Sequence, residues 1–208
     1  MDRHQITGLL LAGGRATRMG EVDKGLMPFG QGSMASAVLQ RITPQIGPVL
    51  INANRNLTRY LEFGRPVLTD HTLGHPGPLA GMQAGLHVCQ TPYLLSVPCD
   101  APFLPHDLAL RLANALIGSK ADVAVAATVD AGGKTRKQPV FCLMKVSVLA
   151  NLDAYLLAGG RRVGAWQAGL AVAEVVFDHD AAFRNINTLQ QLQDSRQCLD
   201  AEPEETVP

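Results

Sequence analysis

Two adjacent glycines followed by positive charges form the chemically most suggestive segment of the chain. In "LLLAGGRATRMGEVDKGL", an apolar run ends at Gly13 and Gly14, and three cations follow, namely Arg15, Arg18 and Lys24. Glycine lets the backbone approach a ligand closely, and unpaired N–H groups after a buried strand bind phosphate oxygens. Arginine and lysine side chains would neutralise the bound phosphates. The segment therefore predicts a polyphosphate site.

Two well-known phosphate-binding loops do not fit this segment. The dinucleotide fingerprint needs GxGxxG and an acidic residue about twenty positions later, whereas the chain has "GGRATRMG" and asparagines in "NAN". The P-loop needs GxxxxGK followed by serine or threonine, whereas Gly25 follows Lys24 here. The alternative without a ligand is a tight turn at Gly13 and Gly14 with solvated cations.

Asp100 is the candidate metal ligand. It follows an almost entirely apolar segment in "LLSVPCDAPFL", and Pro98 and Pro102 stiffen the turn that presents it. Magnesium in proteins is commonly held by one or two carboxylates, water and substrate phosphates. An aspartate favoured only by turn chemistry is the alternative. We expect Asp107, at a helix start, to act only as a cap.

The composition excludes several classes of protein. The chain has 208 residues, 47% of them apolar, and a formal net charge of zero, so no overall field would attract nucleic acid or an anionic membrane. Its first apolar run is too short to span a bilayer, and its four cysteines show neither a CxxC pair nor metal-ligand spacing. We expect a cytoplasmic protein without disulfides, with a single domain over residues 1–198 and a flexible acidic tail at 199–208.

Short apolar runs alternate with segments of helical periodicity along most of the chain. The expected strands are Ile6–Leu11, Val49–Ile51, Val67–Thr69, Tyr93–Val97, Asp122–Thr128, Val140–Met144 and Val172–Phe177. Two expected helices begin after Ser33 and Asp107, which can cap them. Further helices are expected at Leu79–His87, Val146–Ala158 and Thr188–Gln197.

The strand pattern indicates the fold class. Several of the expected strands lack polar alternation, which is typical of strands covered by helices on both faces. This predicts a three-layer α/β domain with a mostly parallel sheet. Because ligands of such sheets bind at the carboxyl ends of the strands, we expect the loops after the strands to form the site.

The motifs together resemble those of nucleotidyltransferases, and within that group those of the molybdenum cofactor guanylyltransferases. "LAGGxxxRMGxxDKGL", "INANR", "VLTDHTLGHPGPLAGM", "PCDAPFLP", "GGRRV" and "FRNINTLQQL" occur in the order seen in that family. The first motif is shared with cytidylyltransferases, whereas the whole set is much more specific. The resemblance runs from about Ile6 to Leu192 and implies a Rossmann-like nucleotidyltransferase fold.

The resemblance implies a GTP site in the loops after the strands. The residues that it implies are Leu11, Ala12, Gly13, Gly14, Lys24, Asn52, Asp70 and Asp100, with Asp100 also on Mg²⁺. The chemistry agrees, because an aspartate can accept from N1–H and the exocyclic amine of guanine, and an asparagine can bind ribose or a base edge. A turn aspartate at a strand end is the alternative for Asp70.

The resemblance also implies a molybdopterin side of the site. The residues are Arg161 and Arg162 in "GGRRV" and Asn185 and Asn187 in "NINT". A solvated helix start and helix caps are the alternatives for them. The chain departs from the family pattern at Glu21, where glycine is usual, and in "GQGSMA", which lacks the usual lysine. These departures concern substrate affinity more than the reaction.

The implied reaction is transfer of GMP from GTP to molybdopterin, with release of pyrophosphate. The terminal phosphate of molybdopterin would attack the α-phosphorus, so no covalent intermediate and no general base are required. Asp100 would hold Mg²⁺, while Arg18 and Lys24 would stabilise the triphosphate and the departing pyrophosphate. Proteins of cofactor biosynthesis and recipient molybdoenzymes would be the protein partners.

Other functions stay open at this stage. Within enzymes, the rivals are transfer of CMP to the same cofactor and transfer of a nucleotide to a sugar phosphate. Gly14 favours the larger purine by family analogy, since cytidylyltransferases often carry alanine there. The rival from another class is a non-catalytic carrier of nucleotide or molybdenum cofactor, against which the joint presence of Lys24 and Asp100 argues.

Overall fold

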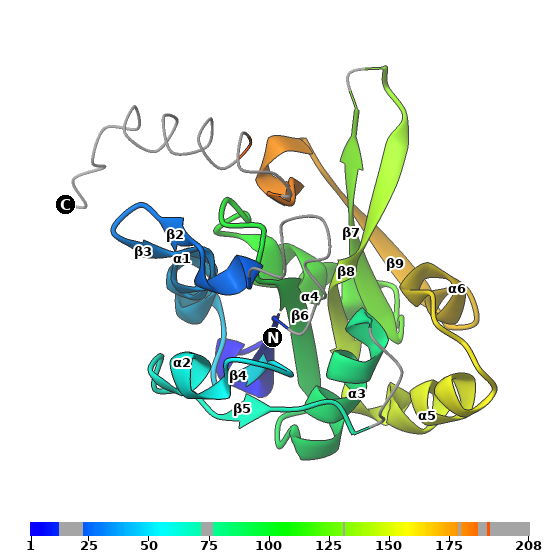
Figure 1. Ribbon diagram of the computed structural model, residues 1–208. Coiled ribbons are helices and arrows are strands. Elements are labelled where there is room, and N and C mark those ends of the chain that lie inside the picture. The colour runs from blue at the N-terminus through cyan, green and yellow to red at the C-terminus, as the bar shows by residue number, and fades with distance from the viewer. Residues whose placement is uncertain (13–22, 72–76, 131, 179, 187–190, 192–208) are drawn as a thin grey trace.

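A seven-stranded sheet forms the centre of the fold, in the order β5-β4-β1-β6-β8-β7-β9 (Figure 1). The computed structural model describes residues 1–12, 23–71, 77–130, 132–178, 180–186 and 191. The strands of this sheet are β1 (Ile6–Leu11), β4 (Val49–Asn52), β5 (Val67–Leu68), β6 (Tyr93–Pro98), β7 (Val123–Val129), β8 (Thr135–Lys145) and β9 (Val172–Phe177). Neighbouring strands pair in parallel, except that β8 runs antiparallel to β6 and β7.

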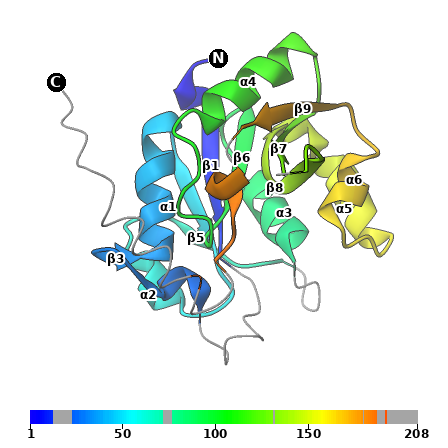
Figure 2. The ribbon, with the colours of Figure 1, turned by 90° about the horizontal axis from the view of Figure 1, so that it is seen from above.

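Helices cover both faces of this sheet (Figure 2). The α-helices are α1 (Met34–Ile42), α2 (Leu57–Leu61), α3 (Pro78–Val88), α4 (Leu108–Gly118), α5 (Leu149–Leu157) and α6 (Val163–Gln167). Short 3-10 helices lie at Arg3–Gln5, Lys24–Leu26, Thr43–Gln45, Val146–Val148 and Asp180–Phe183. None of the helices in the described residues has the length and apolar character of a membrane-spanning segment.

Alternate residues of the strands pack against different helices. Leu10 belongs to a buried cluster with α1 and α4, whereas Leu9 belongs to a second cluster with α3, α5 and α6. Because both sides of each central strand are buried, the strands need no polar alternation. The predicted three-layer α/β fold with a mostly parallel sheet is therefore confirmed.

The observed elements differ from the prediction where the local signal is weak. A hairpin of β2 (Pro28–Phe29) and β3 (Gly32–Ser33) was not expected, and neither were the five-residue helices α2 and α6, which are too short to show a period. β8 begins at Thr135 rather than Val140. Of the helix expected at Thr188–Gln197, the structure describes only Gln191.

The parallel strands direct four loops to one edge of the sheet. β4 and β5 lie on one side of β1 and β6 lies on the other, so the strand order reverses at β1. The ladder continues past the strand ends, since the N–H of Ala12 donates to Asn52 O (2.8 Å) and the N–H of Cys99 donates to Leu11 O (3.0 Å). Such a reversal point is where α/β folds of this kind bind ligands.

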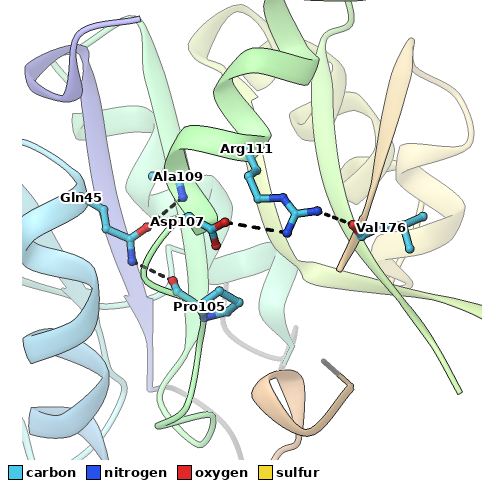
Figure 3. A network of polar contacts seen from close by, with 6 residues as sticks. All are labelled: Gln45, Pro105, Asp107, Ala109, Arg111 and Val176. Carbon is cyan, nitrogen blue, oxygen red and sulfur yellow. Dashed lines mark hydrogen bonds and ion pairs between the residues drawn. The ribbon is translucent and has the colours of Figure 1, made fainter. Parts of the chain in front are cut away.

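The two predicted helix caps have different outcomes. Ser33 caps α1 through a reciprocal pair of hydrogen bonds with Ser36, as expected. Asp107 precedes α4, but its side chain makes no capping bond, and its carboxylate lies 3.8 Å from Arg111 Nη1. Gln45 caps the helix in its place: Gln45 Oε1 accepts from the N–H of Ala109 (2.9 Å), as Figure 3 shows.

Gln45 also secures the loop before α4, because its Nε2 donates to Pro105 O at 2.9 Å (Figure 3). We predict that Gln45→Ala lowers the free energy of unfolding by about 1–2 kcal/mol, the usual cost of a lost cap. Asp107→Ala, which removes only a half-exposed ion pair, should cost less than about 0.5 kcal/mol. Urea unfolding of both variants measures this. A larger loss for Asp107→Ala than for Gln45→Ala would contradict the assignment.

Candidate active site

A pocket of about 220 Å³ opens at the carboxyl edge of the parallel strands. The sequence-predicted residues that line it are Leu11, Ala12, Lys24, Asn52, Asp70, Asp100 and Asn185. They come from the ends of β1, β4, β5 and β6, from the 3-10 helix at Lys24–Leu26 and from the segment after β9. Residues that are up to 174 positions apart in the chain, namely Leu11 and Asn185, therefore share one cavity.

Some predicted residues are not part of this cavity or cannot be placed. Gly13, Gly14, Arg18 and Asn187 lie outside the described residues, as do Arg15 and Glu21. Arg161 and Arg162 are described and exposed, but neither lines the pocket. Arg161 instead donates to Gly160 O (2.8 Å) at the loop before α6. Of the residues assigned to the molybdopterin side, the pocket contains Asn185 alone among those described.

Lys24 and Asp100 form an ion pair in the pocket. Lys24 Nζ lies 3.2 Å from Asp100 Oδ2, and the two side chains are only 22% and 14% exposed. The loop after β6 is fixed in turn, because Asp100 O accepts from the N–H of Ile186 (2.8 Å). Burial raises the pKa of Asp100, and the Lys24 ammonium group acts against this by stabilising the carboxylate.

The donor set around Asp100 fits one kind of metal ion. Within the described part of the chain, no group of three or more His, Cys, Asp and Glu side chains could hold a metal. A structural zinc site would need such a group. A single carboxylate that faces a pocket is sufficient for Mg²⁺, which takes its other ligands from water and substrate phosphates. Asp100, whose carboxylate lines the pocket next to Lys24, fits this kind of binding.

A buried network holds the residue before Lys24. The carboxylate of Asp23 is 6% exposed and lies 3.8 Å from Arg55 Nε. It accepts from Tyr60 Oη (2.6 Å) and from Asn56 Nδ2 (3.0 Å). Asn56 has a left-handed backbone (φ 52°), which asparagine tolerates better than most residues. Glycine would adopt this backbone more easily, but it has no side chain to donate to Asp23. The network fixes the start of the 3-10 helix that carries Lys24.

A second polar group lies at the ends of β4 and β5. Asn52 is buried, and its Nδ2 donates to Asp70 Oδ1 at 3.0 Å. Helix α3 packs very closely on this group, because a β-carbon at Gly81 would overlap with Asn52 Oδ1. The first residue of α3, Pro78, and Gly77 before it line the pocket. The absence of a side chain at Gly81 is what permits this approach.

The pocket wall on the other side comes from an irregularity in β8. The register between β7 and β8 shifts, since Val125 pairs with Cys142 and Ala126 pairs with Gln138. Val140 lies within this bulge and lines the pocket, and its carbonyl accepts from Ser96 Oγ (2.5 Å). Val140 was not expected as a site residue, although a proline at 139 inside a strand is a signal for a bulge.

The strand order spreads these groups across the pocket. Asn52 and Asp70 lie at the β4–β5 end, Lys24 and Asp100 lie near the middle strands β1 and β6, and Val140 lies at the β8 end. The middle can bind phosphate and a divalent ion, while the β4–β5 end offers a carboxylate acceptor to a ligand with N–H donors. Such an arrangement suits a molecule with a heterocycle at one end and phosphates next to it.

The sequence of the chain is similar to sequences of known proteins. Residues 8–172 match the family described as MobA-like NTP transferase domain. A molybdenum cofactor guanylyltransferase from Cupriavidus necator is 54% identical over 190 residues, which are 91% of this chain and 96% of the relative. A molybdenum cofactor guanylyltransferase from Bordetella petrii is 50% identical over 193 residues, which are 93% of this chain and 98% of the relative.

A solved structure shows the same fold. The molybdopterin-guanine dinucleotide biosynthesis protein A from Archaeoglobus fulgidus superimposes with a TM-score of 0.76 at 18% identity, over 94% of this chain and 100% of that chain. A 4-diphosphocytidyl-2C-methyl-D-erythritol synthase from Anaerococcus prevotii superimposes with a TM-score of 0.72 at 15% identity, over 96% of this chain and 100% of that chain. At these identities the likeness concerns the fold alone.

The Asp23 network should contribute to stability as well as to the site. Tyr60 is fully buried, and burial raises the pKa of its hydroxyl far above the ordinary value, so it stays a donor to Asp23. We predict that Tyr60→Phe lowers the free energy of unfolding by about 1–3 kcal/mol, because a buried carboxylate loses a partner. Chemical denaturation at neutral pH measures this loss.

Tyr155→Phe is the matched control for this variant. It makes the same chemical change at a solvent-exposed bond, in which Tyr155 Oη donates to Arg162 O (3.2 Å). Its cost should stay below about 0.5 kcal/mol, as is usual for surface substitutions. Equal costs for the two variants would mean that the Asp23–Tyr60 bond adds nothing to the stability of the site.

Proposed function

The chain belongs to the MobA-like NTP transferase family, and we propose that it transfers GMP from GTP to molybdopterin, giving molybdopterin guanine dinucleotide and pyrophosphate. The observation that carries this proposal is the contact of Lys24 with Asp100 in the cavity that also contains Asp70. A cation and a carboxylate for the phosphates then lie next to an acceptor for the base. The names of the relatives supply the acceptor substrate.

The β4–β5 end of the pocket supports guanine as the base. Guanine presents two adjacent donors, N1–H and the exocyclic amine, to which one carboxylate can bind with both oxygens. Cytosine and adenine each place a ring nitrogen lone pair next to their amine, which would repel the same carboxylate. Asp70, with Asn52 beside it, therefore favours GTP over CTP and ATP.

Val140 and Asn185 are the proposed contacts of molybdopterin. Val140 lies at the β8 end of the pocket, away from Asp70. Asn185 lines the pocket directly before Ile186, whose N–H donates to Asp100 O. A substrate bound there would have its terminal phosphate next to the middle of the pocket, where Lys24 and Asp100 lie. Arg161, Arg162 and Asn187 stay predictions for contacts outside the cavity.

The proposed reaction is an in-line displacement at the α-phosphorus. An oxygen of the terminal phosphate of molybdopterin forms a bond to the α-phosphorus of GTP, and the bond from this phosphorus to the bridging oxygen of the β-phosphate breaks. Pyrophosphate leaves with that electron pair. The nucleophile is already an anion, so no side chain has to remove a proton, and catalysis rests on positioning and charge stabilisation.

The described residues have separate roles in this step. Lys24 compensates the negative charge that moves to the leaving pyrophosphate. Asp100 would hold a magnesium ion, which when bound supplies positive charge to the α-phosphate and the leaving group. Burial raises the pKa of the neighbouring Cys99 thiol, so this side chain stays neutral and is a poor nucleophile. Arg18, which we propose to bind the triphosphate, lies outside the described residues.

We propose the cytoplasm as the site of the reaction. Cys89, Cys99 and Cys142, the cysteines in the described part of the chain, are all unpaired, which fits a reducing compartment. Proteins of cofactor biosynthesis and recipient molybdoenzymes are the proposed protein partners, since the product has to reach an apo-enzyme.

Asp100→Ala should abolish turnover. We expect pyrophosphate release with GTP, molybdopterin and Mg²⁺ to fall by about a thousandfold or more, because the metal would lose its protein ligand. The control is Asp122→Ala, which breaks a similar lysine–aspartate contact (Lys145 Nζ to Asp122 Oδ1, 3.3 Å) at the opposite edge of the sheet. Near-normal magnesium-dependent turnover of Asp100→Ala would remove the central assignment.

Lys24→Ala should weaken both binding and chemistry. We expect the rate to fall by about 10²–10³, the range found when one donor to a developing negative charge is removed, and GTP affinity should fall as well. Steady-state kinetics and GTP titration separate the two effects, and Lys145→Ala serves as the control. Unchanged values for Lys24→Ala would leave the loop without a role in nucleotide binding.

A nucleotide comparison separates the rival functions. The proposal predicts pyrophosphate release with GTP and molybdopterin, and much less with CTP or ATP. Preference for CTP would make the protein a cytidylyltransferase. Nucleotide binding without any pyrophosphate release would instead indicate a non-catalytic carrier.

A further inference from the structure

Asn54 binds both the side chain and the main chain of Asp70, although it does not line the pocket. We infer that Asn54 is a positioning residue that sets the preference for guanine by fixing the Asp70 carboxylate. This inference rests on the proposed function, because it assigns Asp70 to the base of GTP. It adds a residue that acts through Asp70 and has no contact with the nucleotide of its own.

The geometry is a closed ring of two hydrogen bonds. Asn54 Nδ2 donates to Asp70 Oδ2 at 2.8 Å, and the N–H of Asp70 donates to Asn54 Oδ1 at 2.9 Å. A single amide group therefore fixes the backbone at residue 70 and the orientation of its carboxylate together. The second carboxylate oxygen, Oδ1, accepts from Asn52 Nδ2 at 3.0 Å. Each oxygen of Asp70 thus has one amide partner on a different side chain.

These hydrogen bonds matter because the aspartate side chain has no strongly preferred orientation of its carboxylate. The terminal torsion of an aspartate side chain has a broad energy profile, so an unsupported carboxylate at a strand end would rotate. Guanine recognition requires both oxygens to lie in the plane of the base at the same time. A carboxylate oxygen can accept more than one hydrogen bond, so the contacts with Asn52 and Asn54 leave capacity for N1–H and the amine.

Asn54 is a cleaner test of this idea than Asn52. Asn52 is buried, lines the pocket and contacts α3. Its substitution would therefore change the packing of α3 and the shape of the pocket together with the support of Asp70. Asn54 is exposed and bonds to Asp70 from outside the cavity. A change in base selectivity on substitution of Asn54 therefore reports on Asp70, whereas a merely structural role would reduce the use of all nucleotides alike.

The experiment compares GTP with ITP, which lacks the exocyclic amine. The wild-type enzyme should prefer GTP in kcat/KM by about 10- to 100-fold, the range expected for one hydrogen bond to a charged group. In Asn54→Ala this ratio should fall about fivefold or more, because the two oxygens are no longer held in place. Asn114→Ala, at an exposed asparagine of α4 outside the pocket, should leave the ratio unchanged.

A second variant covers the case in which Asn54→Ala fails to fold. Asn54→Asp keeps an acceptor for the N–H of Asp70 but replaces the donor to its carboxylate by an oxygen that repels it, so the ratio should fall there as well. Thermal melting and equilibrium binding of GTP and ITP to each variant show whether the protein is folded and whether the effect lies in binding. An unchanged GTP to ITP ratio in a folded Asn54 variant would overturn the inference.

Asp70→Asn separates this inference from the proposed function. If Asp70→Asn keeps the wild-type preference for GTP, the base is bound elsewhere and the assignment of Asp70 falls, together with the inference. If Asp70→Asn loses the preference while the Asn54 variants keep it, only the role of Asn54 is refuted. Loss of the preference in both supports Asn54 as the residue that positions Asp70.

Discussion

The partly buried contact between Lys24 and Asp100 is the interaction on which the rest of the site depends. The two residues are 76 positions apart in the chain, yet their charged groups lie 3.2 Å from each other. Strands β1 and β6 are parallel neighbours, so the loops that follow them meet at one edge of the sheet. The strand order then arranges the other groups on either side: the hydrogen-bonded pair Asn52 and Asp70 towards β5, and Val140 towards β8. The layout of the sheet thus matches the order base, phosphates and acceptor in the proposed reaction.

The loop after β4 connects the two halves of the proposed nucleotide site. Asn54 bonds to Asp70, and Asn56, two residues later, bonds to Asp23, which precedes Lys24. One short segment therefore supports both the residue proposed for the base and the residue proposed for the phosphates. Since side chains in such a site must be held within a fraction of an ångström to act, this support is part of how the fold produces activity. Asn56 adopts a strained left-handed backbone, and this conformation directs its side chain to Asp23.

The site could be predicted from the sequence where its signal is local. Lys24 and Asp100 each follow an apolar strand in a loop with glycine or proline, and these types of residue at that place already indicate phosphate and metal chemistry. The residues that the sequence did not reveal depend on contacts over long distances in the chain. Tyr60 meets Asp23 across 37 positions, Gln45 caps α4 at Ala109 across 64, and Val140 reaches the pocket only because β8 bulges. No periodicity or spacing rule encodes such contacts, since they arise when separate elements pack.

The most direct test of the account is a crystal structure of the protein with Mg²⁺ and a GTP analogue that cannot be cleaved. We expect the guanine next to Asp70 and Asn52, the phosphates in contact with Lys24, and the metal ion in contact with Asp100. A nucleotide bound away from this pocket, or a metal ion that has no contact with Asp100, would contradict it.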